Sequence, residues 1–351
     1  MSSYTVIGLM SGTSLDGLDI ACCEFSEMEG VWKYSIKDAR TVKYTVEMKK
    51  NLENASVLNG LDLTKLSKEF GKFSGQHVKL FCEENTIKPD FIASHGHTVF
   101  HQPQNGLTLQ IGSGAEIAAI TNLATICDFR SSDVALGGQG APLVAIGDQI
   151  LFGEYDFCLN LGGFANISFE NKNSRASFDI CPVNIVMNEL CKEIGKDFDL
   201  NGDIAKTGKI HQELLNKLNS LTYYAMPFPK SLGKEWIEMN IRPLFYNTGL
   251  SLQDRLRTFY EHIAIQLRNS TQHVQNKNIF ITGGGAHNSF LIERIQQLTN
   301  HRLIIPAEKI INFKEALVFA FLGVLRYREE TNCLSSVTGA TRDSISGAIY
   351  L

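Results

Sequence analysis

The segment Gly8-Leu9-Met10-Ser11-Gly12-Thr13-Ser14-Leu15-Asp16-Gly17 joins two apolar stretches near the start of the chain. The flanking residues 5–9 and 18–25 have the composition of strands, so the segment predicts a β-hairpin with Gly, Ser and Thr at its tip. A phosphate is bound by closely spaced backbone N–H groups, which small residues expose, while a hydroxyl or a carboxylate positions its Mg²⁺. The tip is therefore either a phosphate-binding loop or an ordinary hairpin turn, in which Gly and Ser serve the geometry.

Two further glycine turns occur later in the chain. Gly162-Gly163 lies between apolar strands, and Gly283-Gly284-Gly285 follows a strand at 278–282 and precedes a helix that begins near Asn288. A strand, a glycine turn and a helix N-terminus favour an anion or nucleotide site, because free N–H groups face the turn. The repeated hairpin indicates an internal duplication. Three such turns favour a nucleotide cleft closed from both sides, and the spacing matches neither a P-loop nor a dinucleotide-binding fingerprint.

The length of 351 residues predicts about two domains, at about 150 residues each. Strands at 34–46 and 91–94 and a helix at 63–84 complete an α/β pattern in the first part. The Gly-, Ser- and Asp-rich stretch 128–142 is typical of a long functional or connecting loop. We therefore expect an α/β fold of two domains, residues 1–140 and 141–351, with a cleft between them.

Composition excludes several classes of protein. The net charge of −4 and the pI near 6.2 provide no basic surface, so we expect no nucleic-acid partner. The longest apolar run, residues 316–325, is half the length of a membrane span and predicts a buried helix rather than a membrane partner. The N-terminus lacks the Lys or Arg of an export signal, and the eight cysteines include no C-x-x-C pair. These features predict a cytoplasmic protein with reduced thiols.

Asp179 follows a predicted strand and precedes a predicted helix. An aspartate there is either the N-cap of the helix, which is the commoner use, or a general base that deprotonates a nucleophile. Position alone favours the cap.

Polar residues gather in two other places. His95, His97 and His101 lie close together, which suggests a metal site, but no acidic ligand follows the pair, so a polar turn that faces a substrate is favoured. Arg130 lies between Asp128 and Asp133 and serves either a structural ion pair or an anion clamp. The sequence does not separate these two alternatives.

Taken together, these motifs resemble the anhydro-N-acetylmuramic acid kinases, a bacterial family of the actin-like and sugar-kinase superfamily. The resemblance spans essentially the whole chain. It is carried by the segments at 8–17, 94–98, 109–112, 128–130, 137–142, 160–163, 229–233, 282–288, 314–317 and 337–340.

This resemblance implies a two-domain actin-like fold of the ribonuclease H-like type with a nucleotide cleft. It implies that ATP and Mg²⁺ phosphorylate 1,6-anhydro-N-acetylmuramic acid, with hydrolytic opening of the anhydro ring, to give N-acetylmuramic acid 6-phosphate during cell-wall recycling. A homodimer is also implied. Two alternatives stay open, a kinase of another amino sugar or hexose and a non-enzymatic actin-like ATP-binding protein.

The resemblance assigns roles to individual residues. Asp179 becomes the base that acts on water, which reverses the preference for a cap. His97, Arg130 and Glu315 become sugar-pocket residues, and Asp16 becomes a candidate ligand of the Mg²⁺ that the ATP phosphates carry. The first phosphate loop comprises Gly12, Thr13, Ser14, Leu15, Asp16, Gly17, Leu18 and Asp19. The second comprises Gly162 and Gly163, and the turn on the nucleoside side comprises Gly283, Gly284, Gly285 and Asn288.

The chain departs from the family's pattern beside the proposed base. The family commonly has Asp-Thr-Gly-Pro-Gly-Asn where this chain has Asp179-Ile180-Cys181-Pro182-Val183-Asn184, and it has Asp where this chain has Asn188. Because the aspartate, the proline and the asparagine remain, we expect the base to be kept while the loop packs differently.

Overall fold

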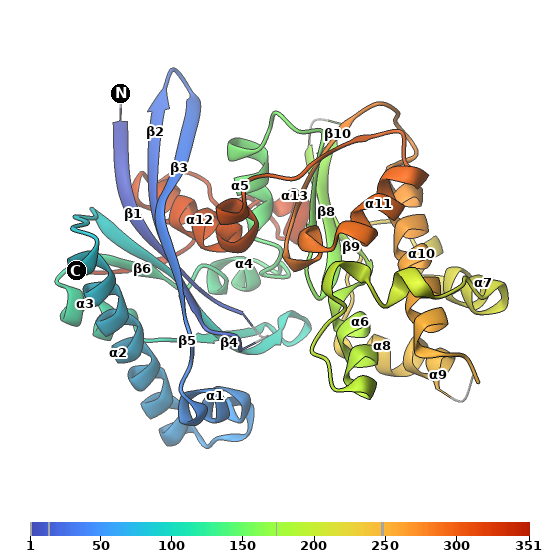
Figure 1. Cartoon of the computed structure of the whole chain (residues 1–351). Helices are drawn as coiled ribbons and strands as arrows, with labels where there is room; N and C mark the ends of the chain where they lie inside the picture. The colour runs from blue at the N-terminus through green and yellow to red at the C-terminus, as the bar shows by residue number, and fades with distance from the viewer. Residues whose placement is uncertain (1, 13–14, 173, 247–248) are drawn as a thin grey trace. The chain divides into compact units, whose positions relative to one another are not determined.

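The computed structural model describes residues 2–12, 15–172, 174–246 and 249–351. Its contacts separate two compact units, unit 1 with Met1–Leu151 and Phe313–Leu351, and unit 2 with Phe152–Asn312. This division differs from the expected domains 1–140 and 141–351, because the C-terminal segment returns to pack on unit 1 (Figure 1). The predicted loop residues Thr13 and Ser14 lie outside the described residues.

Unit 1 is a mixed β-sheet with helices on both faces. Its sheet order is β12-β6-β4-β1-β2-β3, with β5 paired to β4. The strands are β1 (Ser2–Ser11), β2 (Leu18–Met28), β3 (Val31–Val42), β4 (Phe91–Gln102), β5 (Leu107–Ile111), β6 (Thr125–Cys127) and β12 (Ala348–Tyr350). The helices are α1 (Val46–Glu53), α2 (Gly60–Glu84), α3 (Gly114–Thr121), α4 (Ser131–Ala135), α5 (Val144–Leu151), α12 (Glu308–Tyr327) and α13 (Ser335–Thr338).

Both faces of β1 are buried, which explains why the strand has a continuous apolar run rather than an alternating pattern. Ile7 and Leu9 point into a core shared with α2. On the other face α12 approaches so closely that a Cβ on Gly8 would overlap the carbonyl oxygen of Ala316. The predicted apolar helix at 316–325 therefore exists, and it is the buried cover of this sheet face.

Unit 2 is a second sheet, of order β11-β10-β7-β8-β9, with its own hydrophobic core. The strands are β7 (Phe157–Leu161), β8 (Phe164–Asn171), β9 (Ser174–Pro182), β10 (Asn278–Thr282) and β11 (Arg302–Ile304). The helices are α6 (Asn184–Cys191), α7 (Gln212–Asn219), α8 (Lys234–Asn240), α9 (Arg242–Phe245), α10 (Leu252–Thr271) and α11 (Ser289–Leu298).

The two sheets share one topology. In each sheet three antiparallel strands that follow one another in the chain, β1-β2-β3 or β7-β8-β9, form one side of the sheet. A fourth strand then pairs in parallel with the first, and a fifth pairs in parallel with the fourth. The hairpin with a glycine tip thus recurs at the same place in each unit, as the sequence repeat predicts.

Two local predictions are wrong. The histidine-rich segment is not a turn, because β5 folds back and pairs with residues 97–102, so that β4 continues as a strand through Gln102. Asp179 is not a helix cap, because it pairs with Asn166 inside β9, and the N-cap position of α6 belongs to Val183. In both cases a distant partner strand decides the local structure.

Within the described ranges we find no helix long and apolar enough to cross a bilayer. The eight cysteines all lie in these ranges, and none forms a disulfide.

Candidate active site

The hairpin tip of unit 1 joins β1 to β2. Leu15 adopts a left-handed conformation with φ 58°, and its N–H donates to the Gly12 carbonyl at 3.3 Å. A Cβ on Gly17 would lie 2.5 Å from the carbonyl oxygen of Val42, so only glycine lets the tip approach β3 this closely. The glycine at this buried position is therefore a packing requirement of the tip.

Acidic side chains of unit 1 interact near this tip. Burial raises the pKa of Asp19 to about 6. The Thr41 hydroxyl, which donates to this carboxylate at 2.6 Å, lowers the pKa, whereas the charges of Glu315 and Asp16 raise it. Burial also raises the pKa of Glu315, and the positive charges of Arg130 and Lys314 oppose that shift. The carboxylate of Asp19 therefore lies within electrostatic range of two other acidic side chains.

No group of three His, Cys, Asp or Glu side chains in the described part of the chain is arranged to hold a metal ion. Mg²⁺ in kinases is usually held by one or two carboxylates together with substrate phosphates and water, rather than by a cage of protein ligands. Asp16 and Asp19 fit that requirement.

Arg130 precedes α4 and is held by two acceptors. Its Nε and Nη2 lie 3.1 Å and 2.9 Å from Nε2 of His95, and its Nη1 donates to the Gly140 carbonyl at 2.6 Å. The Nδ1–H of His95 donates to the Gly96 carbonyl at 2.9 Å, which leaves the Nε2 lone pair for the guanidinium. Burial lowers the pKa of Arg130 to about 10, although Glu315 opposes this. Among the described residues no carboxylate lies within ion-pair distance of Arg130, so the structural Arg–Asp pair considered from the sequence is absent there.

His97 faces the end of β1. Its Nδ1 lies 2.9 Å from Oγ of Ser11, to which the hydroxyl of Tyr44 donates at 2.6 Å. Burial lowers the pKa of His97 to about 4. The ring is therefore neutral at physiological pH and suits a hydrogen bond to a substrate better than an ion pair.

The two glycine turns of unit 2 come together because β7 and β10 are parallel neighbours. Gly283 has φ 82°, and a Cβ there would lie 2.6 Å from Oδ1 of Asn160 at the end of β7. Asn184 donates from Nδ2 to the Leu161 carbonyl at 3.0 Å and lies beside Gly284 and Gly285. Asn184 was not predicted as a site residue, although its position directly after the altered proline loop could have identified it.

The second phosphate loop is tied to the N-terminus of α6. The Gly162 carbonyl accepts from the Asn184 N–H at 3.2 Å, and the Gly163 carbonyl accepts from the Val183 N–H at 2.8 Å. Asn288 caps α11, since its Oδ1 accepts from the Leu291 N–H at 3.0 Å. Its Nδ2 donates to the hydroxyl of Tyr260 at 2.6 Å and to a backbone carbonyl. The amide of Asn288 is thus occupied by the protein itself.

Asp179 is held at the side of β9 by a segment that follows much later in the sequence. The Leu232 N–H donates to Oδ2 of Asp179 at 2.9 Å, and the Tyr223 hydroxyl donates to its backbone carbonyl at 2.6 Å. Burial raises the pKa of Asp179 to about 6, while the Leu232 N–H opposes the shift. A carboxylate with a pKa just below neutrality is well suited to act as a general base.

The side chains of the altered loop beside Asp179 lie in the core of unit 2. Cys181 and Val183, which stand where the family commonly has Gly, are fully buried in the hydrophobic core of unit 2. Their side chains fill the core and leave the carboxylate of Asp179 in contact with Leu232.

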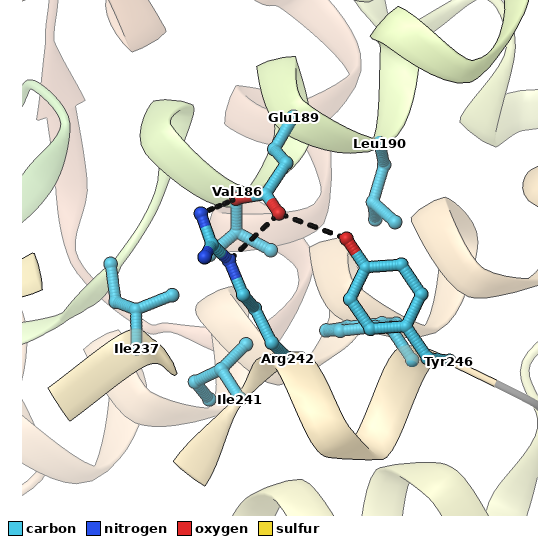
Figure 2. A pocket seen from close by; sticks show the side chains of 8 residues that line it. Val186, Glu189, Leu190, Ile237, Ile241, Arg242 and Tyr246 are labelled. Carbon is cyan, nitrogen blue, oxygen red and sulfur yellow. Dashed lines mark hydrogen bonds and ion pairs between the residues drawn. The ribbon is translucent and has the colours of Figure 1, made fainter. Parts of the chain in front are cut away.

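Unit 2 also has a pocket between α6 and the α8–α9 pair (Figure 2). Its walls are apolar, with Val186 and Ile237 among them, and an ion pair of Arg242 with Glu189 at 2.9 Å lies at its edge. Its volume, open solvent included, is about 230 Å³. None of the predicted site residues lines it.

The two units repeat one α/β topology, each with a glycine-tipped hairpin between its first two strands. The model of the family described as "Anhydro-N-acetylmuramic acid kinase" matches residues 4–351. The chain therefore belongs to the anhydro-N-acetylmuramic acid kinase family, and the resemblance that its motifs indicate is confirmed.

Curated relatives extend over the same length. A protein of Hydrogenovibrio crunogenus named "Anhydro-N-acetylmuramic acid kinase" is 35% identical and covers 99% of this chain and 98% of its own. A protein of the same name from Saccharophagus degradans is 34% identical and covers 100% of both chains.

Proposed function

We propose that the protein uses ATP to phosphorylate 1,6-anhydro-N-acetylmuramic acid and opens the anhydro ring with water, giving N-acetylmuramic acid 6-phosphate and ADP in cell-wall recycling. The observation that carries this proposal is the family match along residues 4–351. The match disfavours both alternatives, a kinase of a simple hexose and an actin-like protein without catalysis.

The chemistry assigns a role to Asp179. In the anhydro sugar O6 is bound to C1 and has no proton, so water must attack C1 while the C1–O6 bond breaks. The electron pair of that bond stays on O6, which takes the γ-phosphoryl group as the bond to ADP breaks. Asp179 accepts the proton of the attacking water. Its raised pKa and its position on a strand support this role.

ATP is the phosphoryl donor of this kinase family. We propose that backbone N–H groups of both glycine-tipped hairpins bind its phosphates and that the Gly283–Gly285 turn contacts the nucleoside. Asn288 acts through the helix that it caps. Mg²⁺ supplies charge neutralisation at the phosphates, with Asp16 and Asp19 as the side chains that would hold it.

Three residues of unit 1 are proposed to bind the sugar. Arg130 suits the lactyl carboxylate, because a guanidinium binds carboxylates through paired donors. His97 suits an uncharged polar group of the sugar. Glu315, which interacts electrostatically with Arg130, completes this set.

Purified protein incubated with ATP, Mg²⁺ and the anhydro sugar should release ADP and the 6-phosphate, with a panel of simple hexoses as the comparison. Reaction in ¹⁸O-labelled water should place the label at C1, since only ring opening by water does so. Turnover with hexoses and none with the anhydro sugar would refute the proposal. Omitting Mg²⁺, with EDTA present, tests the metal.

Three further expectations accompany this function. We propose a homodimer, which sedimentation velocity tests, and a cytoplasmic location, which cysteines without disulfides favour because cytosolic thiols stay reduced. We also propose that residues 1–140 act as one functional part of unit 1, which ends where Arg130 donates to the Gly140 carbonyl.

A further inference from the structure

Three side chains of unit 1, Tyr44, Ser11 and His97, form a hydrogen-bonded series. Of these only His97 has a proposed role so far. Ser11 is the last residue of β1 and lies opposite His97 in the parallel pairing of β1 with β4. The Tyr44 hydroxyl donates to Oγ of Ser11 at 2.6 Å, and Oγ lies 2.9 Å from Nδ1 of His97. Ser11 and His97 are 2% and 4% exposed, so water does not compete for these bonds.

Counting protons decides which nitrogen of His97 carries the hydrogen. The Ser11 hydroxyl accepts a hydrogen bond from the Tyr44 hydroxyl and has one proton of its own to donate. Among the described residues its only other partner is Nδ1 of His97. If Nδ1 also carried a proton, it would donate to the second lone pair of Ser11 Oγ, and the Ser11 proton would have no acceptor among the described residues, which is unfavourable in a buried place. The Ser11 proton therefore points to an unprotonated Nδ1.

Burial keeps the participants uncharged. It lowers the pKa of His97 to about 4 and raises the pKa of Tyr44 to about 12, although the bond to Ser11 opposes the shift of Tyr44. A neutral imidazole with an unprotonated Nδ1 has its hydrogen on Nε2.

Aromatic rings surround the series. Tyr44 packs against Phe70 and Phe73, with ring centroids 6.1 Å and 5.8 Å away, and Phe70 meets His97 edge to face at 6.2 Å. These rings fix the orientations of Tyr44 and His97. They also keep the local dielectric low, which strengthens each hydrogen bond.

We infer that Tyr44 and Ser11 are positioning residues, which hold His97 in the Nε2–H tautomer so that its ring offers an N–H donor to an acceptor oxygen of the bound sugar. Nε2 has no hydrogen-bond partner within the described residues, so this donor is available. The inference rests on the proposed sugar-binding role of His97.

The chemistry of the sugar agrees with a donor at this place. In the anhydro sugar one ether oxygen bridges C1 and C6, and the oxygen on C3 carries the lactyl group. Carbonyl, carboxylate and ether oxygens thus outnumber hydroxyl groups. An Nε2 lone pair would have few protons to accept, whereas an N–H has several acceptors.

Long-range ¹H–¹⁵N spectra of protein labelled at histidine nitrogens test the tautomer directly, with His97→Gln to assign the signals. We expect a lone-pair shift for Nδ1 and an N–H shift for Nε2. In Ser11→Ala the two nitrogens should move towards averaged shifts, because Nδ1 loses its donor. A protonated Nδ1 in the wild-type protein would overturn the inference, and so would unchanged shifts in Ser11→Ala.

Kinetics provide the second measurement. Ser11→Ala should raise the KM for the sugar about three- to tenfold, as expected for one hydrogen bond, with a smaller change in kcat. Tyr44→Phe removes a hydroxyl farther from the phosphate loop and should also raise the KM for the sugar. This variant keeps the test valid if Ser11→Ala disturbs ATP binding or folding. An unchanged KM in both variants would count against the inference.

Ser74→Ala is the matched control, because it removes a buried hydroxyl that donates to the Phe70 carbonyl at 2.8 Å but does not touch His97. It should leave the tautomer and the KM unchanged. The spectra need no turnover, so they also separate failure of this inference from failure of the proposed reaction.

Discussion

Arg130 directs both Nε and Nη2 at a single atom, Nε2 of His95, at 3.1 Å and 2.9 Å. His95 can accept these bonds only while it is neutral, and burial together with the charge of Arg130 holds its pKa well below the ordinary value. A histidine 4% exposed thus acts as a fixed acceptor that orients a guanidinium. The sequence identified both residues as candidates but did not predict the hydrogen bonds between them.

Replacing His95 with Ala should remove this acceptor and leave two donors of Arg130 unpaired. We expect a loss of about 1–3 kcal/mol in the free energy of unfolding and a higher KM for the sugar. His95→Gln, which retains an acceptor oxygen, should recover part of both effects. Urea denaturation and steady-state kinetics measure them. His101→Ala, a more exposed histidine of the same strand, is the control, and equal losses in the two alanine variants would contradict the argument.

Asp179→Asn should abolish most turnover without destabilising the fold. General base catalysis is worth about 10²–10⁴-fold, so kcat should fall by that factor. The Leu232 N–H still finds an oxygen on the asparagine, and a buried negative charge is removed, so the free energy of unfolding at pH 7.5 should stay equal or rise. Stopped-flow kinetics and urea denaturation give the two values. A variant that loses stability and activity together would indicate a structural role instead.

The activity should depend on the ionisation of Asp179. Burial raises its pKa from 3.8 to about 6, and the base works only when deprotonated, so kcat/KM should rise with pH and reach half its maximum near pH 6. The folded state holds this proton more tightly than the unfolded state. The stability cost of ionising Asp179 is therefore present above pH 6 and disappears below pH 4.

Asp19 has a pKa of about 6 as well, so a pH profile alone does not identify the base. The residual activity of Asp179→Asn separates the two groups, because only the Asp179 limb should vanish from its profile. An unaltered acid limb in that variant would assign the titration to Asp19.

Gly283→Ala tests the close approach of the two glycine turns in unit 2. The new Cβ would lie 2.6 Å from Asn160 Oδ1 and 2.8 Å from the backbone of Leu161, in addition to the strain of φ 82°. Gly195→Ala is matched to it, since φ is 69° there and no atom lies within 4 Å of the added Cβ. The control should lose about 1–2 kcal/mol of stability through backbone strain alone.

Gly283→Ala should lose more stability than this control and should also weaken ATP binding. Urea denaturation and calorimetric titration with ATP measure the two effects. Equal stability losses and equal ATP affinities in the two variants would show that the contact between the turns is unimportant.

The sequence by itself determined the elements whose signals are local. Apolar runs identified β1, β7 and β10, and the run at 316–325 identified the buried helix α12, because strand and helix periodicity is encoded by neighbouring residues. The glycine turns were also visible, since close backbone approach leaves few alternatives to glycine. The ordered series of motifs was enough to identify the family.

Only the tertiary structure decided what those residues contact. From the sequence Asp179 was interpreted as a helix cap or a base. In the structure it lies in a strand paired with β8, and the N–H of Leu232, 53 positions later, donates to its carboxylate. The segment after Ser94 is a strand because β5 folds back on it, and Nδ1 of His97 meets the hydroxyl of Ser11, 86 positions earlier. Hydrogen bonds, burial and tautomers of this kind depend on distant segments that only folding brings together, and no local pattern encodes them.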